Sequence, residues 1–83
     1  MNITSMSMEA YVTQDLPLAA TLVVLGHHLI DIERTNPRRA GFCFTNSQQL
    51  QELVRRFQTG QLAIEPHAYF DAIRHVKSRL YGD

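Results

Sequence analysis

The four histidines are the side chains of this chain best suited to bind a transition metal. His27 and His28 are adjacent in an expected strand, so their side chains should point to opposite faces. His67 and His75 are eight residues apart in an expected helix, which separates them by about 12 Å along the axis. The one cysteine, Cys43, leaves no pair of thiolates to complete a zinc site. We therefore expect no metal site.

Cys43 and the acidic pair Asp31 and Glu33 could carry catalytic chemistry. A nucleophilic thiol needs a base and an electropositive pocket, but Cys43 lies mid-strand between two phenylalanines. Asp31 and Glu33 share a strand face as paired carboxylates do, but a solvated strand face is the better account of them. Phosphate-binding, dinucleotide-binding, serine-hydrolase and zinc-protease motifs are absent. We expect no catalytic or cofactor-binding residues; a deep pocket joining His28, Asp31 and Cys43 would favour an enzyme instead.

Arginines form the third group, and they outnumber lysine seven to one. Arg34, Arg38 and Arg39 surround an expected hairpin turn, TNPRRAG, and Arg55 and Arg56 lie on an expected helix. Guanidinium groups bind phosphate or carboxylate in a bidentate manner. A hairpin tip that carries them can contact a nucleic-acid backbone. The alternative is an ordinary solvated surface, which the formal net charge of zero favours.

The composition predicts one small globular domain. The chain has 83 residues, of which 45% are hydrophobic. At this size a single core rarely supplies more than about 3–5 kcal/mol, so good packing or a second subunit is needed. Residues 1–33 carry four acidic and no basic side chains, whereas residues 34–83 carry four acidic and all eight basic ones. Such asymmetry often marks an interaction surface, with chance as the alternative.

We expect a cytoplasmic location and no membrane contact. A single cysteine excludes an intrachain disulfide and suits a reducing compartment. The first residues, MNITSMSM, lack the basic and apolar regions of a signal peptide. The longest apolar run, residues 16–25, is too short to cross a bilayer.

The pattern predicts a strand, a helix and then a central hairpin. Residues 9–13 are β-prone. Asp15 is an expected N-cap, Pro17 suits the first helical turn, and Gly26 is expected to end that helix. In the hairpin, Ile30 and Ile32 are predicted to share the apolar face of the first strand, as Phe42 and Phe44 do on the second.

Two further helices are expected to cover the hairpin. A capping box of Thr45 with Gln48, or of Asn46 with Gln49, would open the first of them. Its apolar stripe is Leu50, Leu53, Val54 and Phe57. Residues 61–65 form an apolar connector that could pair as an edge strand. Pro66 begins the last helix, whose inner stripe is Tyr69, Ile73, Val76 and Leu80, widened by Ala72.

These elements predict an α+β fold of order β-α-β-β-α-α. A right-handed crossover between parallel first and second strands leaves room for the third strand between them, which gives sheet order 1-3-2. The sheet is then three-stranded and mostly antiparallel, with helices packed on one face. Residues 1–8 are expected to be a flexible tail and residues 9–83 the single domain.

The first helix is apolar nearly all round, which indicates burial on more than one side. Its partner is either the rest of the domain or a second subunit. An uncovered sheet edge also favours association about a twofold axis. Leu22 and Val23 are the expected homodimer contact.

Three segments in order, YVTQDLPLAATLVVLGHHLIDIE, GFCFTNSQQLQELVRRFQTG and AYFDAIRHVKSRLYG, resemble a family of small uncharacterised bacterial and phage proteins. The shared pattern is a T-x-D-L-x-L-A opening, an F-x-F strand, an E-L-V helix that ends at glycine, and a final A-L/I-R-x-L/V-K helix. The resemblance covers about residues 11–82 and implies a compact α+β fold. It implies no chemistry, because this is a domain of unknown function.

The sequence thus favours a small non-enzymatic interaction module, acting as a homodimer that binds another protein. The alternative is a nucleic-acid-binding accessory protein that uses the arginine-bearing hairpin.

Overall fold

The computed structural model describes residues 10–36 and 39–82. Its elements are β1 (Ala10–Thr13), α2 (Leu16–Val24), β2 (Leu29–Asn36), β3 (Arg39–Thr45), α3 (Gln48–Gln58) and α4 (Pro66–Leu80). The order β-α-β-β-α-α confirms the predicted α+β fold. The predicted tail at residues 1–8 lies outside the described residues.

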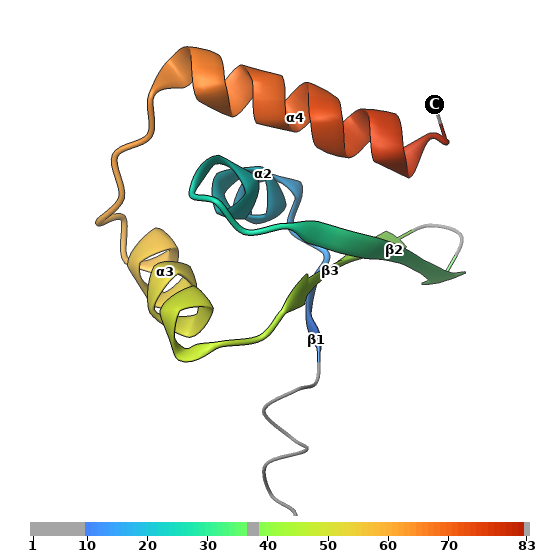
Figure 1. Ribbon diagram of the computed structural model, residues 1–83, viewed down its shortest axis with the longest axis horizontal. Coiled ribbons are helices and arrows are strands. Elements are labelled where there is room, and N and C mark those ends of the chain that lie inside the picture. The colour runs from blue at the N-terminus through green and yellow to red at the C-terminus, as the bar shows by residue number, and fades with distance from the viewer. Residues whose placement is uncertain (1–9, 37–38, 83) are drawn as a thin grey trace, which may run out of the picture.

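The three strands form one open sheet with β3 in the middle (Figure 1). β1 and β2 are both antiparallel to β3, which confirms the order 1-3-2. Phe42 and Phe44 of β3 and Leu29 of β2 point from one face into the core. The hairpin therefore forms one side of the core, against which the helices pack.

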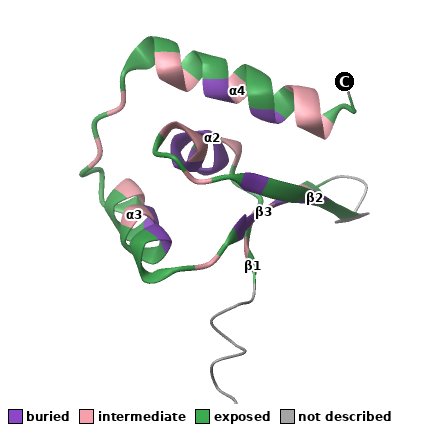
Figure 2. Cartoon of the chain, viewed as in Figure 1, coloured by how far each residue is buried: buried purple, intermediate pink, exposed green. Residues whose placement is uncertain are grey.

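Helix α2 occupies the middle of the molecule, between the sheet and α4 (Figure 1). Buried residues lie along α2, and others lie on β2, β3, α3 and α4 (Figure 2). Helix α3 contacts the same helix beside the sheet. This enclosure within one chain explains why α2 is apolar nearly all round.

The position of α2 changes the interpretation of its apolar residues. The side chain of Leu22, expected at a homodimer contact, is fully buried in the core of the single chain. That expectation was wrong for Leu22, because a second copy cannot reach it while this fold is intact. Val23 is partly buried against the same core.

The caps predicted for α2 are present. The backbone N–H of Leu18 donates to Asp15 Oδ1 at 3.1 Å. At the other end Gly26 has a φ of 96°, and its N–H donates to the Val23 carbonyl. The N–H of His27 donates to the Leu22 carbonyl at 2.9 Å, which completes a Schellman motif.

Two local predictions at either end of α3 were wrong. The N-cap is Ser47, whose Oγ accepts from Leu50 N at 3.0 Å, and neither Thr45 nor Asn46 caps the helix. Thr45 is still the last residue of β3, paired with Ala10, so the helix cannot begin there. Residues 61–65 form no strand, because this connector runs on the side of the molecule away from the sheet (Figure 1).

A β-bulge in β2 makes one prediction wrong: the side chains of Ile30 and Ile32 do not share one face of the strand. Leu29 pairs with Phe44 and Asp31 with Cys43, so the register shifts at Ile30. The extra residue lets two residues of one strand oppose one residue of its neighbour. As a result Ile30 is 47% exposed, whereas Leu29 and Ile32 share the buried face.

Candidate protein-binding groove

An apolar hollow of about 480 Å³ lies between the end of α3 and the start of α4. Thr21 of α2 lies at its inner side. The remaining lining residues come from α3, the connector and α4: Phe57, Gly60, Leu62, Ile64, Pro66, Tyr69 and Phe70. We call this surface the α3–α4 groove.

The ends of the two helices explain why the chain forms a groove here. Gly60, with φ of 73°, ends α3, and its N–H donates to the Phe57 carbonyl. Helix α4 begins at Pro66 after the N-cap Glu65, whose carboxylate accepts from the backbone N–H groups of His67 and Ala68 at 3.1 and 2.8 Å. The connector runs between these two caps, and its half-buried residues Leu62 and Ile64 line the groove.

Two aromatic side chains form the α4 wall of the groove. The Tyr69 and Phe70 rings pack edge to face with centroids 6.3 Å apart. Phe70 is nevertheless 61% exposed. A large aromatic side chain that remains exposed beside other apolar residues is typical of a site that binds a partner.

The Thr21 hydroxyl, at the inner side of the groove, already makes a hydrogen bond within the chain. Thr21 Oγ1 donates to the Pro17 carbonyl at 2.8 Å, within α2. The groove is therefore mainly an apolar surface, with an internal hydrogen bond satisfying its buried hydroxyl. Its chemistry suits apolar side chains better than a polar substrate.

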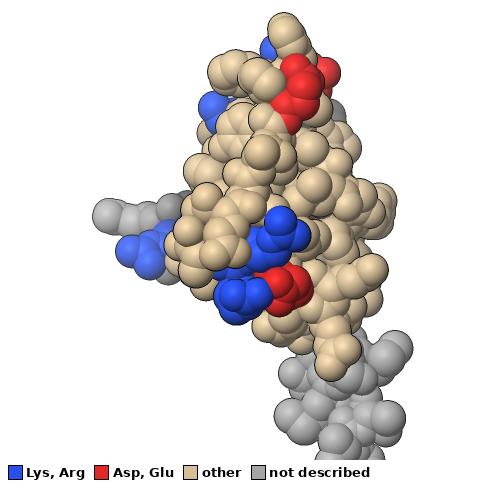
Figure 3. Space-filling model, turned by 90° about the vertical axis from the view of Figure 1, so that its left-hand side faces the viewer, with Lys and Arg blue, Asp and Glu red and all other residues tan. Residues whose placement is uncertain are grey.

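The two flanks of the groove carry opposite charge. Figure 3 shows mainly basic side chains, with an acidic one beside them, at the height of α3, and acidic side chains with basic ones nearby at the start of α4. Mostly uncharged surface lies between these two groups. Arg55 pairs with Glu52, and Arg56 adds a positive charge to that flank. On the other flank Asp71 pairs with Arg74, and Glu65 adds a negative charge.

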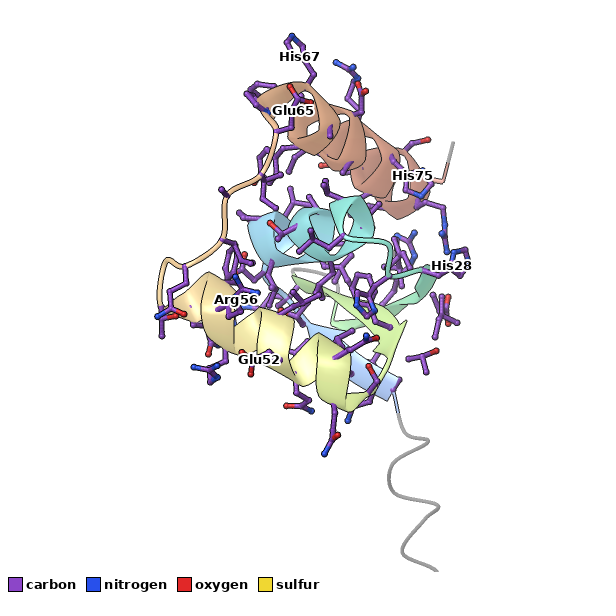
Figure 4. All side chains as sticks on the ribbon, turned by 60° about the vertical axis from the view of Figure 1, so that its left-hand side comes forward. His28, Glu52, Arg56, Glu65, His67 and His75 are labelled. Carbon is purple, nitrogen blue, oxygen red and sulfur yellow. The ribbon has the colours of Figure 1, made fainter. Side chains whose placement is uncertain are left out.

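Glu65 is held in its ionised form. The Ala68 N–H bond, then the contacts with the His67 side chain and backbone, hold the pKa of the Glu65 carboxyl below its ordinary value. The carboxylate lies 2.9 Å from His67 Nδ1 (Figure 4). The negative flank therefore persists at neutral pH.

The structure divides the predicted arginine cluster between two surfaces. Arg55 and Arg56 lie on α3 beside the groove (Figure 4 labels Arg56), whereas Arg34 and Arg39 lie on the hairpin at the opposite end of the molecule (Figure 1). Arg38 lies outside the described residues. The four arginines that the structure describes therefore do not form one common surface for a partner.

The hairpin arginines have local partners. Arg34 donates to the Arg79 carbonyl at 3.0 Å, and Arg39 Nη1 donates to Gln14 Oε1 at 3.3 Å. Arg79 donates to the carbonyls of Leu29 and Ile30 on β2. Arg79 lies in the last turn of α4, where a positive charge is favourable beside the helix carbonyls. That position could be expected from the sequence, but the contact with β2 could not.

Cys43 is not activated as a nucleophile. It pairs in the sheet with Asp31, and its Sγ lies 3.8 Å from the Gly41 carbonyl. Burial, and then the negative charges of Glu33 and Asp31, raise the pKa of the Cys43 thiol. A raised pKa keeps the thiol protonated at neutral pH, which is the reverse of what nucleophilic catalysis requires.

The histidines are dispersed. His67 lies at the start of α4 and His75 farther along that helix, while His28 precedes β2 (Figure 4). Within residues 10–36 and 39–82, no group of three or more His, Cys, Asp or Glu side chains is placed to hold a metal ion.

Sequence reasoning missed the groove itself. Phe70 falls outside the buried stripe of α4, and the apolar connector residues Leu62 and Ile64 have no strand to join. These were the available signals: apolar side chains with no predicted place in the core.

The fold and the groove define a small α+β domain with an apolar, charge-flanked surface hollow. The sequence matches the model of a family described as "Domain of unknown function (DUF5659)" over residues 8–82, and the chain belongs to this family. Neither the curated proteins nor the solved structures contain a match. In the part of the chain that the structure describes, none of the helices has the length and apolar character needed to cross a membrane.

Proposed function

We propose that this chain is a small, non-enzymatic interaction module that binds another protein through the α3–α4 groove. The cytoplasm is the proposed location, because the free Cys43 suits a reducing compartment. The observation that carries the proposal is the exposure of Phe70 beside Leu62 and Ile64 in an apolar hollow.

The energetic reason is the burial of apolar surface. Covering such side chains contributes roughly 25 cal/mol per Å². Aromatic side chains at the centre of an interface commonly dominate its binding energy. Phe70 and Tyr69 stand on a helix that is capped at its start, so little ordering is needed before a partner binds.

Selection of peptides from a random display library tests the proposal. The wild-type chain is the target, and Phe70→Ser is the counter-target. Tyr81→Ser is the matched control, because Tyr81 is also an exposed aromatic side chain of the α4 end but lies outside the groove.

We expect enriched peptides with apolar anchors that bind the wild type and Tyr81→Ser alike, and bind Phe70→Ser at least tenfold more weakly. Failure to enrich any peptide, or equal binding to Phe70→Ser, would contradict the proposal.

The second candidate is a nucleic-acid-binding accessory protein, and the observation that favours it is the position of Arg39 and Arg34 beside the basic last turn of α4. Fluorescence anisotropy with a short labelled duplex tests it. Affinity should fall steeply with added salt, and Arg39→Ala should weaken binding more than Arg56→Ala, since Arg56 lies on the other surface. Salt-independent or undetectable binding would exclude this candidate.

A further inference from the structure

The α3–α4 groove has one basic and one acidic flank. On the α3 side the pairing of Arg55 with Glu52 leaves the positive charge of Arg56. On the α4 side the pairing of Asp71 with Arg74 leaves the negative charge of Glu65. The uncharged surface with the groove lies between these flanks (Figure 3).

A twofold axis through the centre of such a surface makes it complementary to itself. Rotation by 180° places the basic flank of one copy against the acidic flank of the other, and the contact forms twice. Isologous contacts of this kind are the commonest basis of homodimers. The apolar centre then meets an identical apolar centre, and Phe70 of each copy is covered.

We propose that the partner of the α3–α4 groove is a second copy of this chain, docked about a twofold axis. The inference rests on the proposed function, since it names the occupant of the same surface. It moves the homodimer contact from the buried Leu22 of α2 to exposed residues of α4 and the connector. The small core of an 83-residue chain gives such a contact a stabilising role as well.

Sedimentation equilibrium over a range of protein concentrations is the first measurement. The wild type should pass from 9.5 kDa towards twice that mass as the concentration rises. Phe70→Glu should weaken the dimer at least tenfold, because it buries a charge at the centre of the contact. Tyr81→Glu is the matched control and should leave the dimer unchanged.

A charge exchange tests the twofold arrangement directly. Arg56→Glu and Glu65→Arg should each weaken self-association at low salt, because each brings like charges together. An equimolar mixture of the two variants should restore dimers, since both contacts again join opposite charges. If Glu65→Arg fails to fold for want of its N-cap, Asp71→Arg replaces it on the same flank.

The outcomes separate the two proposals. A wild-type chain that stays monomeric up to about 1 mM overturns the second copy as partner. Peptides that still bind the groove would then leave the proposed function intact. A dimer insensitive to Phe70→Glu, or a mixture that fails to restore dimers, would overturn the groove or the twofold arrangement as the contact.

Discussion

The guanidinium of Arg34 donates a hydrogen bond to the carbonyl of Arg79, 45 residues away in the sequence. Arg79 in turn donates from its own guanidinium to the carbonyls of Leu29 and Ile30, at 2.9 and 3.3 Å. The pair connects β2 to the last turn of α4. It also satisfies backbone carbonyls beside the β-bulge, where an edge strand would otherwise offer them to another chain.

Arg79→Ala should lower the free energy of unfolding by about 1–2 kcal/mol, because a charged, part-buried hydrogen bond to the Leu29 carbonyl and an exposed one to the Ile30 carbonyl are lost. Arg74→Ala is the control on the same helix, since Arg74 makes an exposed ion pair with Asp71. That change should cost less than about 0.5 kcal/mol. Urea unfolding measures both, and equal effects would show that the Arg79 contacts with β2 do not stabilise the fold.

The β-bulge predicts unequal effects for the two isoleucines of β2. Ile32→Ala should destabilise by about 2–4 kcal/mol, because Ile32 is in the buried core. Ile30→Ala should cost less than about 1 kcal/mol, because Ile30 remains 47% exposed. Unfolding midpoints in urea measure the ranking, and the reverse order would contradict the register of β2.

Glu65 should make stability depend on pH in the acidic range. Its pKa is lowered in the folded chain, mainly by the Ala68 N–H bond, so its contribution is present above the unfolded value of about 4.3 and is lost as pH falls through the folded value. Glu65→Gln lacks this contribution. The melting-temperature difference between wild type and Glu65→Gln should therefore be largest near neutral pH and shrink on acidification; a difference that grows would refute the cap's role.

Cys43 should react slowly with alkylating reagents. Burial and the charges of Glu33 and Asp31 raise the pKa of its thiol, so less thiolate is present at mildly alkaline pH than in the unfolded chain. Iodoacetamide labelling followed by mass spectrometry should be slower for the folded protein. Replacing Asp31 with Asn and Glu33 with Gln should speed it; no change would indicate that these charges do not influence the thiol.

Much of the architecture was predictable because it depends on local rules. Asp15, Pro17 and Gly26 set the limits of α2 through hydrogen bonds and backbone angles that lie within a few residues of each other. The F-x-F alternation placed Phe42 and Phe44 on the buried face of β3. The strand order followed from chain connectivity.

Errors arose where a residue's environment depends on distant partners. Ile30 looked equivalent to Ile32 by alternation, but the register with β3 inserts it as an extra residue at the bulge. Thr45 has a side chain suited to cap α3, but its pairing with Ala10 of β1 makes it part of the sheet instead. Leu22 looked available for a second subunit until α4 and the sheet enclosed α2.

By itself, the sequence determined the elements, their order and most of the apolar faces, Ile30 of β2 excepted, since caps and periodicity act over a few residues. Only the tertiary structure decided that Arg34 and Arg79 meet, that Arg55 and Arg56 lie apart from the hairpin, and that Phe70 lines a groove. The first and last of these relationships depend on how α4 packs against α2. That packing brings together residues that are far apart in the chain. Caps and periodicity are local patterns, so they do not predict it.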